Sequence, residues 1–83
     1  MAGYFGVQTY KKGSKGVLIE DTPQVLTNEA AAVRRAERLA KSRAGAVAFA
    51  RDASEFDEFA EPRFLARFGE VPDHIIEAML IRN

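Results

Sequence analysis

Basic side chains recur at helical spacing within residues 29–43. Arg34, Arg38 and Lys41 are separated by four and three residues, which places them on one side of a helix, and Arg35 lies beside them. Neutralising the phosphates of a nucleic acid requires guanidinium and ammonium groups clustered in this way. The candidate nucleic-acid face is therefore Arg34, Arg35, Arg38 and Lys41, and three lysines at an expected turn would extend it: Lys11, Lys12 and Lys15.

The charge balance of the chain limits the strength of such binding. Its 83 residues include twelve Lys or Arg and twelve Asp or Glu, and Glu29 and Glu37 lie near the basic face. The charges are unevenly distributed, with a net +5 over residues 1–51 and a net −5 over residues 52–83. We therefore expect at most weak, salt-sensitive and sequence-independent binding of nucleic acid, the alternative being an ordinary solvated helix face.

No other constellation offers the partners that catalysis or cofactor binding needs. His74 is the single histidine and there is no cysteine, so the common zinc and thiolate sites are excluded, and no serine stands in a G-x-S-x-G motif. We interpret His74 as a solvated residue near a helix start. The segment from Gly13 to Gly16 lacks the P-loop spacing and is better explained as a hairpin turn. The sequence predicts no catalytic residue, no cofactor and no enzymatic activity.

Carboxylates are concentrated between residues 52 and 61. Carboxylate oxygens bind divalent cations, but the spacing here differs from that of a calcium-binding loop. A solvated loop that partly pairs with the basic helix explains these side chains. We predict no metal site, and the residues concerned are Asp52, Glu55, Asp57, Glu58 and Glu61.

The segment that precedes the basic stretch is typical of a β-hairpin. Aromatic and β-branched residues alternate from residue 4 to residue 11. Residues 12–16 provide a glycine-containing turn, and residues 17–20 the returning strand. A break at residues 21–23 precedes Val25 and Leu26, which would extend the hairpin past a bulge.

The basic stretch itself is predicted to be a helix. Residues 29–43 contain five alanines and neither glycine nor proline, which favours this conformation. Thr27 or Asn28 would cap its start, and Gly45 would end it in a left-handed conformation. A third, central strand over 46–51 and a fourth strand over 63–68 would follow, the fourth at a sheet edge. In this fourth strand the alternation places Phe64, Ala66 and Phe68 on one side and Arg63, Leu65 and Arg67 on the other.

A second, short helix is expected after Pro72, which suits a first helical position. Its apolar residues recur at helical spacing and either complete the protein's own core or contact another chain. The candidate partner face consists of Ile75, Ile76, Met79 and Leu80.

Together these elements predict a single α+β domain over residues 1–83. Its small antiparallel sheet would have the order ββαββα, with the helix over 29–43 packed on one face. Hydrophobic residues make up 47% of the chain and charged residues 29%, which is ordinary for a folded protein. The expected core is Phe5, Val7, Val17, Ile19, Val33, Ala36, Leu39, Ala40, Val47, Phe49, Phe64 and Phe68.

Three stretches, EAAAVRRAERLA, GAVAFAR and FLARFGEVP, are similar to stretches in short uncharacterised bacterial proteins, and the resemblance covers most of residues 28–72. It implies no activity, ligand or functional residue. Without cysteine, a secretory signal or a long apolar run, the protein is expected to be soluble and cytoplasmic. We expect a non-catalytic binding or regulatory module for an unidentified protein partner or a second copy of itself. The alternatives are nucleic-acid binding through the basic helix and, last, a small enzyme.

Overall fold

The computed structural model describes residues 2–53 and 62–80. Its elements are β1 (Ala2–Lys12), the 3-10 turn η1 (Ser14–Gly16), β2 (Leu18–Glu20), β3 (Gln24–Leu26), α1 (Glu29–Leu39), β4 (Gly45–Ala53), β5 (Arg63–Gly69) and α2 (Asp73–Leu80). The strands form one antiparallel sheet in the order β2-β1-β4-β5, and β3 also pairs with β1. The α+β class is confirmed, although the extra strand β3 departs from the predicted order.

The extra strand arises because the strand returning from the hairpin is interrupted. β2 pairs with the end of β1 and β3 with its first half, as predicted for an extension past a bulge. At the interruption the Asp21 backbone N–H donates to the Thr9 carbonyl at 3.0 Å, and Thr9 Oγ1 lies 3.3 Å from Asp21 Oδ2. Pro23 follows and has no N–H to donate, so regular pairing resumes only at β3.

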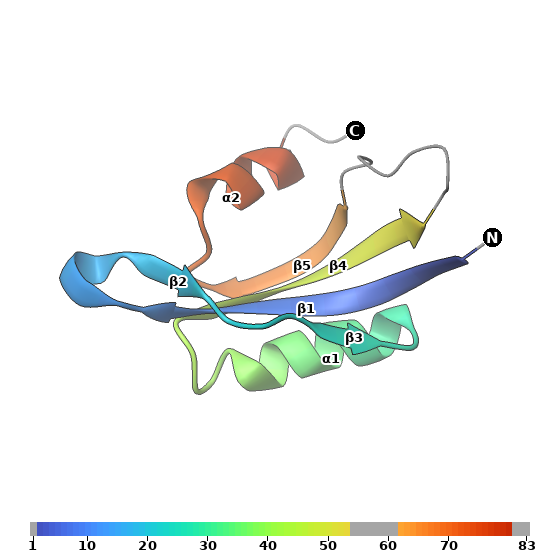
Figure 1. Ribbon diagram of the computed structural model, residues 1–83, viewed down its shortest axis with the longest axis horizontal. Coiled ribbons are helices and arrows are strands. Elements are labelled where there is room, and N and C mark those ends of the chain that lie inside the picture. Colours follow the sequence, from blue (N-terminus) through green and yellow to red (C-terminus); the bar gives the residue numbers. More distant parts are fainter. Residues whose placement is uncertain (1, 54–61, 81–83) are drawn as a thin grey trace.

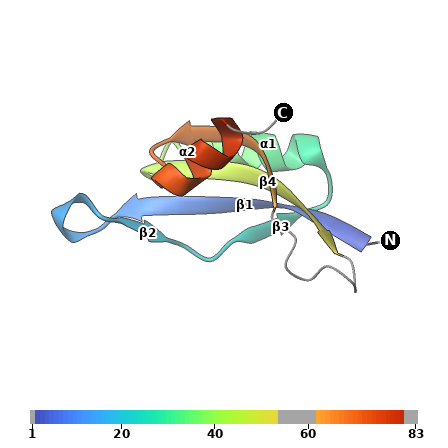
Figure 2. The ribbon, with the colours of Figure 1, turned by 90° about the horizontal axis from the view of Figure 1, so that it is seen from above.

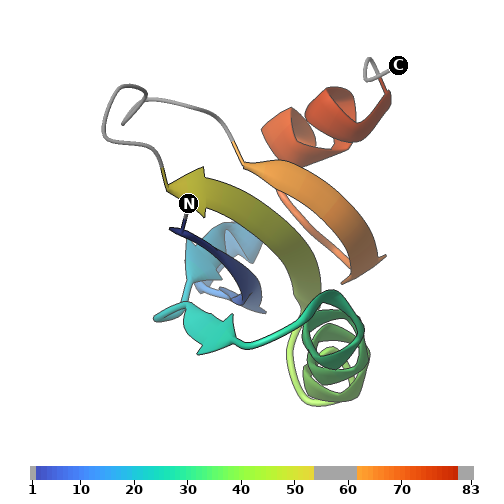
Figure 3. The same cartoon turned by 90° about the vertical axis from the view of Figure 1, so that its right-hand side faces the viewer.

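The two helices lie on opposite faces of the sheet (Figures 1 and 3). On the α1 face, Ala32 and Ala36 are fully buried against Val7, Ala46 and Ala48. Side chains this small let the helix backbone approach the sheet closely. On the other face, the buried residues of a second cluster join β1, β4 and α2: Tyr10, Val47, Val71 and Ile75.

Helix α1 is shorter than predicted. The Asn28 side chain caps it by accepting a hydrogen bond from the Ala31 N–H at 2.8 Å, and the helix ends at Leu39. The prediction that Gly45 terminates the helix is wrong, because Gly45 is the first residue of β4. A Cβ atom there would overlap the backbone of Glu70, so close chain packing explains this glycine.

The predicted core is wrong at two residues. Val17 and Ile19 are 61% and 44% exposed, because the hairpin that carries them extends beyond the rest of the sheet (Figures 1 and 2).

The predicted alternation of β5 is also wrong, although Phe64 is partly buried as expected. The register shifts so that Phe64 lies opposite Phe49 and Ala66 opposite Ala48. This bulge turns Phe64 toward the α2 side, whereas Phe68 packs on the α1 side.

Candidate functional site

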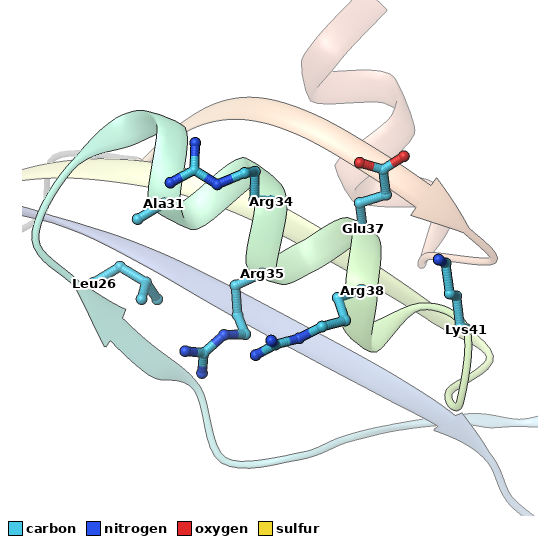
Figure 4. A pocket seen from close by; sticks show the side chains of 7 residues that line it. All are labelled: Leu26, Ala31, Arg34, Arg35, Glu37, Arg38 and Lys41. Carbon is cyan, nitrogen blue, oxygen red and sulfur yellow. The ribbon is translucent and has the colours of Figure 1, made fainter.

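The structure brings the four residues of the candidate nucleic-acid face to one depression along α1 and β3 (Figure 4). Its volume is about 460 Å³. We call it the basic groove, and it is lined by Leu26, Ala31, Arg34, Arg35, Glu37, Arg38 and Lys41.

The basic side chains of the groove are held differently. Arg35 is half-buried, and its Nη1 donates a hydrogen bond to Oε1 of Gln24 at 2.7 Å, which fixes it beside β3. Figure 4 shows Arg38 directed to the same side of α1 as Arg35. Arg34 lies nearer the start of the helix and Lys41 beyond its end. Arg34, Arg38 and Lys41 are exposed and available to a ligand.

The carboxylates of the described residues do not neutralise the charge of the groove. No carboxylate in the described part of the chain lies within ion-pair distance of Arg34, Arg38 or Lys41. Glu37 lines the same groove without pairing with any of them. It lowers the positive potential of the groove and leaves the three cations able to contact an anion.

The predicted extension of this face by the hairpin lysines is limited by ion pairs. Lys11 Nζ lies 3.9 Å from Asp21 Oδ1, and Arg43 Nε lies 3.4 Å from Asp21 Oδ2. Lys12 Nζ lies 2.8 Å from Glu70 Oε1. These are exposed pairs, worth little to stability. They reduce the charge that Lys11 and Lys12 offer to a ligand.

The four apolar residues of α2 do not form one exposed stripe. Ile75 is 3% exposed, and Ile76 and Met79 are partly buried against the cluster around Tyr10 and Val47. Leu80 alone of the four is strongly exposed, at 74%. Most of this face therefore contributes to the protein's own core.

A second pocket, which the sequence did not predict, lies between the sheet and the first turn of α2. Its volume is about 230 Å³. We call it the α2-side pocket, and the lining residues that matter below are Tyr10, Glu20, Phe49, Arg51, Phe64 and His74. Strand pairing and the α2 contact bring these residues together, so no local sequence signal could have identified them.

Tyr10 is the group of the α2-side pocket whose ionisation is displaced. Burial, together with the negative charge of Glu20, raises the pKa of Tyr10 from 10.0 to about 12. Its phenol therefore keeps its proton to a higher pH than the phenol of an exposed tyrosine. His74 lines the margin of the same pocket. It is exposed in the first turn of α2, as predicted for a solvated residue near a helix start.

Within residues 2–53 and 62–80, no group of three His, Asp or Glu side chains is placed to hold a metal ion. The predicted acidic loop falls mainly on residues 54–61, which lie outside the described residues. Among the described helices, none combines the length and apolar character needed to cross a membrane.

Comparison with protein-family models, with curated proteins and with solved structures gave no match.

Proposed function

We propose that this protein is a non-catalytic binding module whose basic groove contacts the phosphate backbone of nucleic acid. The observation that carries the proposal is that three exposed cations, Arg34, Arg38 and Lys41, line one groove without an ion-pair partner among the described carboxylates. Fixed positive charges on one surface bind a polyanion by releasing its condensed counterions.

The spacing of these cations suits a phosphate backbone. Arg34 and Arg38 are four residues apart in α1, which corresponds to about 6 Å along the helix axis. One strand of a duplex presents a phosphate about every 3.4 Å of helix axis, so the two guanidinium groups span about two phosphates. Lys41 extends the contact by a further phosphate.

The composition of the groove favours binding without sequence readout. Its lining contains no aromatic ring for stacking on bases, and the nearby amide of Gln24 is already bonded to Arg35. Base edges are read by side chains held in fixed geometry, which long exposed cations are not. Because the Glu37 carboxylate repels phosphate, we expect weak affinity.

We infer no catalytic role for the groove, because its described lining residues include no hydroxyl, thiol or imidazole group to act as nucleophile or general base. We further propose a cytoplasmic location, on the basis of the cysteine-free composition.

Fluorescence anisotropy with labelled duplex DNA and duplex RNA at low salt tests this function. Arg34→Glu with Arg38→Glu should abolish binding. The control is Arg63→Glu with Arg67→Glu, which makes the same change of net charge at two exposed residues outside the groove. Equal loss of binding in both variants would assign the affinity to net charge rather than to the groove and would contradict the proposal.

Association with a protein or with a second copy is the second candidate function. It is favoured by the projecting hairpin, which exposes the apolar side chains of Val17 and Ile19 (Figure 1). Light scattering over a concentration series, with Val17→Ser and Ile19→Ser as the comparison, tests self-association. A monomer at every concentration would exclude the second copy as the partner.

A further inference from the structure

The charged side chains of the basic groove lie on two sides of α1. Arg35 and Arg38 extend on the side that faces β3, and Figure 4 shows Glu37 directed to the opposite side. At 3.6 residues per turn, Glu37 lies about 160° around the helix from Arg35 and about 100° from Arg38. Its carboxylate therefore acts mainly on Arg34, one turn before it, and on Lys41. The side of the groove that faces β3 keeps more of its positive charge.

Arg35 is held in place from the sheet. Its Nη1 donates a hydrogen bond to Oε1 of Gln24 at 2.7 Å, and Gln24 lies opposite Val7 in the pairing of β3 with β1. The other N–H groups of the guanidinium remain as donors. A side chain that is already fixed loses less conformational freedom when it binds a ligand. Arg35 is therefore the one cation of the groove that is preorganised for an anion.

Arg38 supplies a second guanidinium on the same side of the helix. It follows Arg35 by three residues, a spacing that places the two Cβ atoms about 5–6 Å apart. Figure 4 shows its side chain directed toward Arg35, and both residues line the basic groove. No carboxylate of the described residues lies within ion-pair distance of either guanidinium. Two positive charges are thus available to one anionic group.

The charge of this pair matches a terminal phosphate better than an internal one. A phosphomonoester carries a charge of about −1.5 to −2 at pH 7 and has three strong acceptor oxygens. A phosphodiester within a strand has a single negative charge. Guanidinium groups bind phosphate oxygens through paired N–H donors, and such charge-assisted hydrogen bonds strengthen with the charge of the acceptor.

We propose that Arg35 and Arg38 bind the terminal phosphate of a nucleic-acid strand, with Gln24 as the residue that positions Arg35. This inference rests on the proposed function, because Arg34 and Lys41 then contact phosphates within the same nucleic acid. The groove volume of about 460 Å³ lies within the range of about 300–1,000 Å³ found for small-molecule sites, so it has room for the phosphate and the nucleoside attached to it.

The test compares labelled duplexes of one sequence that differ only at the 5′ end, by fluorescence anisotropy at low salt. A 5′-phosphate should bind about 3- to 10-fold more tightly than a 5′-hydroxyl, since two exposed charge pairs act on it. A 5′-methyl phosphate has the same position but a single negative charge and should give a smaller gain. The same series at the 3′ end identifies which terminus binds.

Variants of the two sides of α1 locate the effect. Arg35→Gln should remove the gain from the terminal phosphate, and Gln24→Ala should reduce it by releasing Arg35. The matched control is Arg34→Gln, which removes the same charge from the other side of α1 and should weaken binding of both duplexes while leaving their ratio unchanged. Thermal melts of each variant check that it is folded.

The failure of this inference is distinct from the failure of the proposed function. If the 5′-hydroxyl duplex binds through Arg34 and Arg38 but neither a 5′- nor a 3′-phosphate adds affinity, the terminal-phosphate site is wrong and the groove still binds nucleic acid. An equal gain from the methyl phosphate, or the same ratio in Arg35→Gln as in Arg34→Gln, would also overturn the site. A nucleoside monophosphate that binds as tightly as the duplex would assign the site to free nucleotides and overturn the strand-end assignment. No binding of any duplex would overturn both proposals.

Discussion

The ring of Phe49 lies over Gly6 on the neighbouring strand, in the space that a Cβ atom of residue 6 would need. Phe49 Cζ would be 2.5 Å from that Cβ atom. Tyr4 contacts the same ring edge-to-face, with 6.3 Å between ring centroids and an interplanar angle of 78°. The glycine therefore determines where one wall of the α2-side pocket lies.

Gly6→Ala should lower the free energy of unfolding by about 1–2 kcal/mol, because the new methyl group displaces the Phe49 ring. Chemical denaturation measures the loss. In a double-mutant cycle, Phe49→Leu should cost less in the Gly6→Ala background than in the wild type, since the shorter side chain relieves the clash. Additive losses would show that the two residues are not coupled.

Gly45→Ala should be more damaging, at about 3 kcal/mol or more. The obstructing atoms here belong to the Glu70 backbone, which cannot swing aside because its N–H donates to the Ala44 carbonyl at 2.9 Å. The comparison is Gly16→Ala, where no atom lies within 4 Å and the positive φ of 77° costs about 1 kcal/mol. Similar losses in the two variants, measured by thermal or chemical unfolding, would argue against the close packing at Gly45.

Ala36→Leu should destabilise the protein by about 1–3 kcal/mol, because Ala36 is fully buried between α1 and the sheet and a larger side chain must push them apart. Arg38→Leu introduces the same side chain two residues away on the exposed side of α1 and should change stability by less than about 0.5 kcal/mol. Circular dichroism melts of both variants test the orientation of the helix, which would be wrong if the melting temperatures agreed.

Stability should fall as pH rises from 10 to 12 because of Tyr10. Its pKa is raised from 10.0 to about 12 in the folded state, so the folded protein retains a proton that the unfolded chain loses in this interval. The contribution is complete below pH 10 and declines through pH 12. Tyr4→Phe leaves Tyr10 as the single tyrosine, whose ionisation can then be followed by ultraviolet absorbance. An apparent pKa near 10 in the folded variant would contradict the burial of this ring.

Local patterns predicted the regular elements because their causes are local. The alternation predicted for residues 4–11 is present in β1, where Val7 faces α1 and Tyr10 faces α2. The spacing of Arg34 and Arg38 likewise located the basic groove, since helical periodicity alone places them on one side.

Features that depend on distant parts of the chain were not predicted. The bulge in β5 reverses the face of Phe64, and its position is set by pairing with β4 rather than by the alternation of the strand. The exposure of Val17 depends on how far the hairpin extends beyond β4 and β5, and the composition of the hairpin does not determine this length. The α2-side pocket requires Tyr10 and Phe64, far apart in sequence, to lie on the same face of the folded sheet.

The salt dependence of binding to duplex DNA tests the proposed function most directly. Three phosphate contacts from Arg34, Arg38 and Lys41 should give a slope of about −2.7 in a plot of log K against log salt concentration, because each contact contributes about −0.9. Arg34→Glu or Arg38→Glu alone should make the slope shallower by about one contact's share. An unchanged slope in these single variants, or no detectable binding of the wild type at low salt, would contradict the assignment of the basic groove as a nucleic-acid interface.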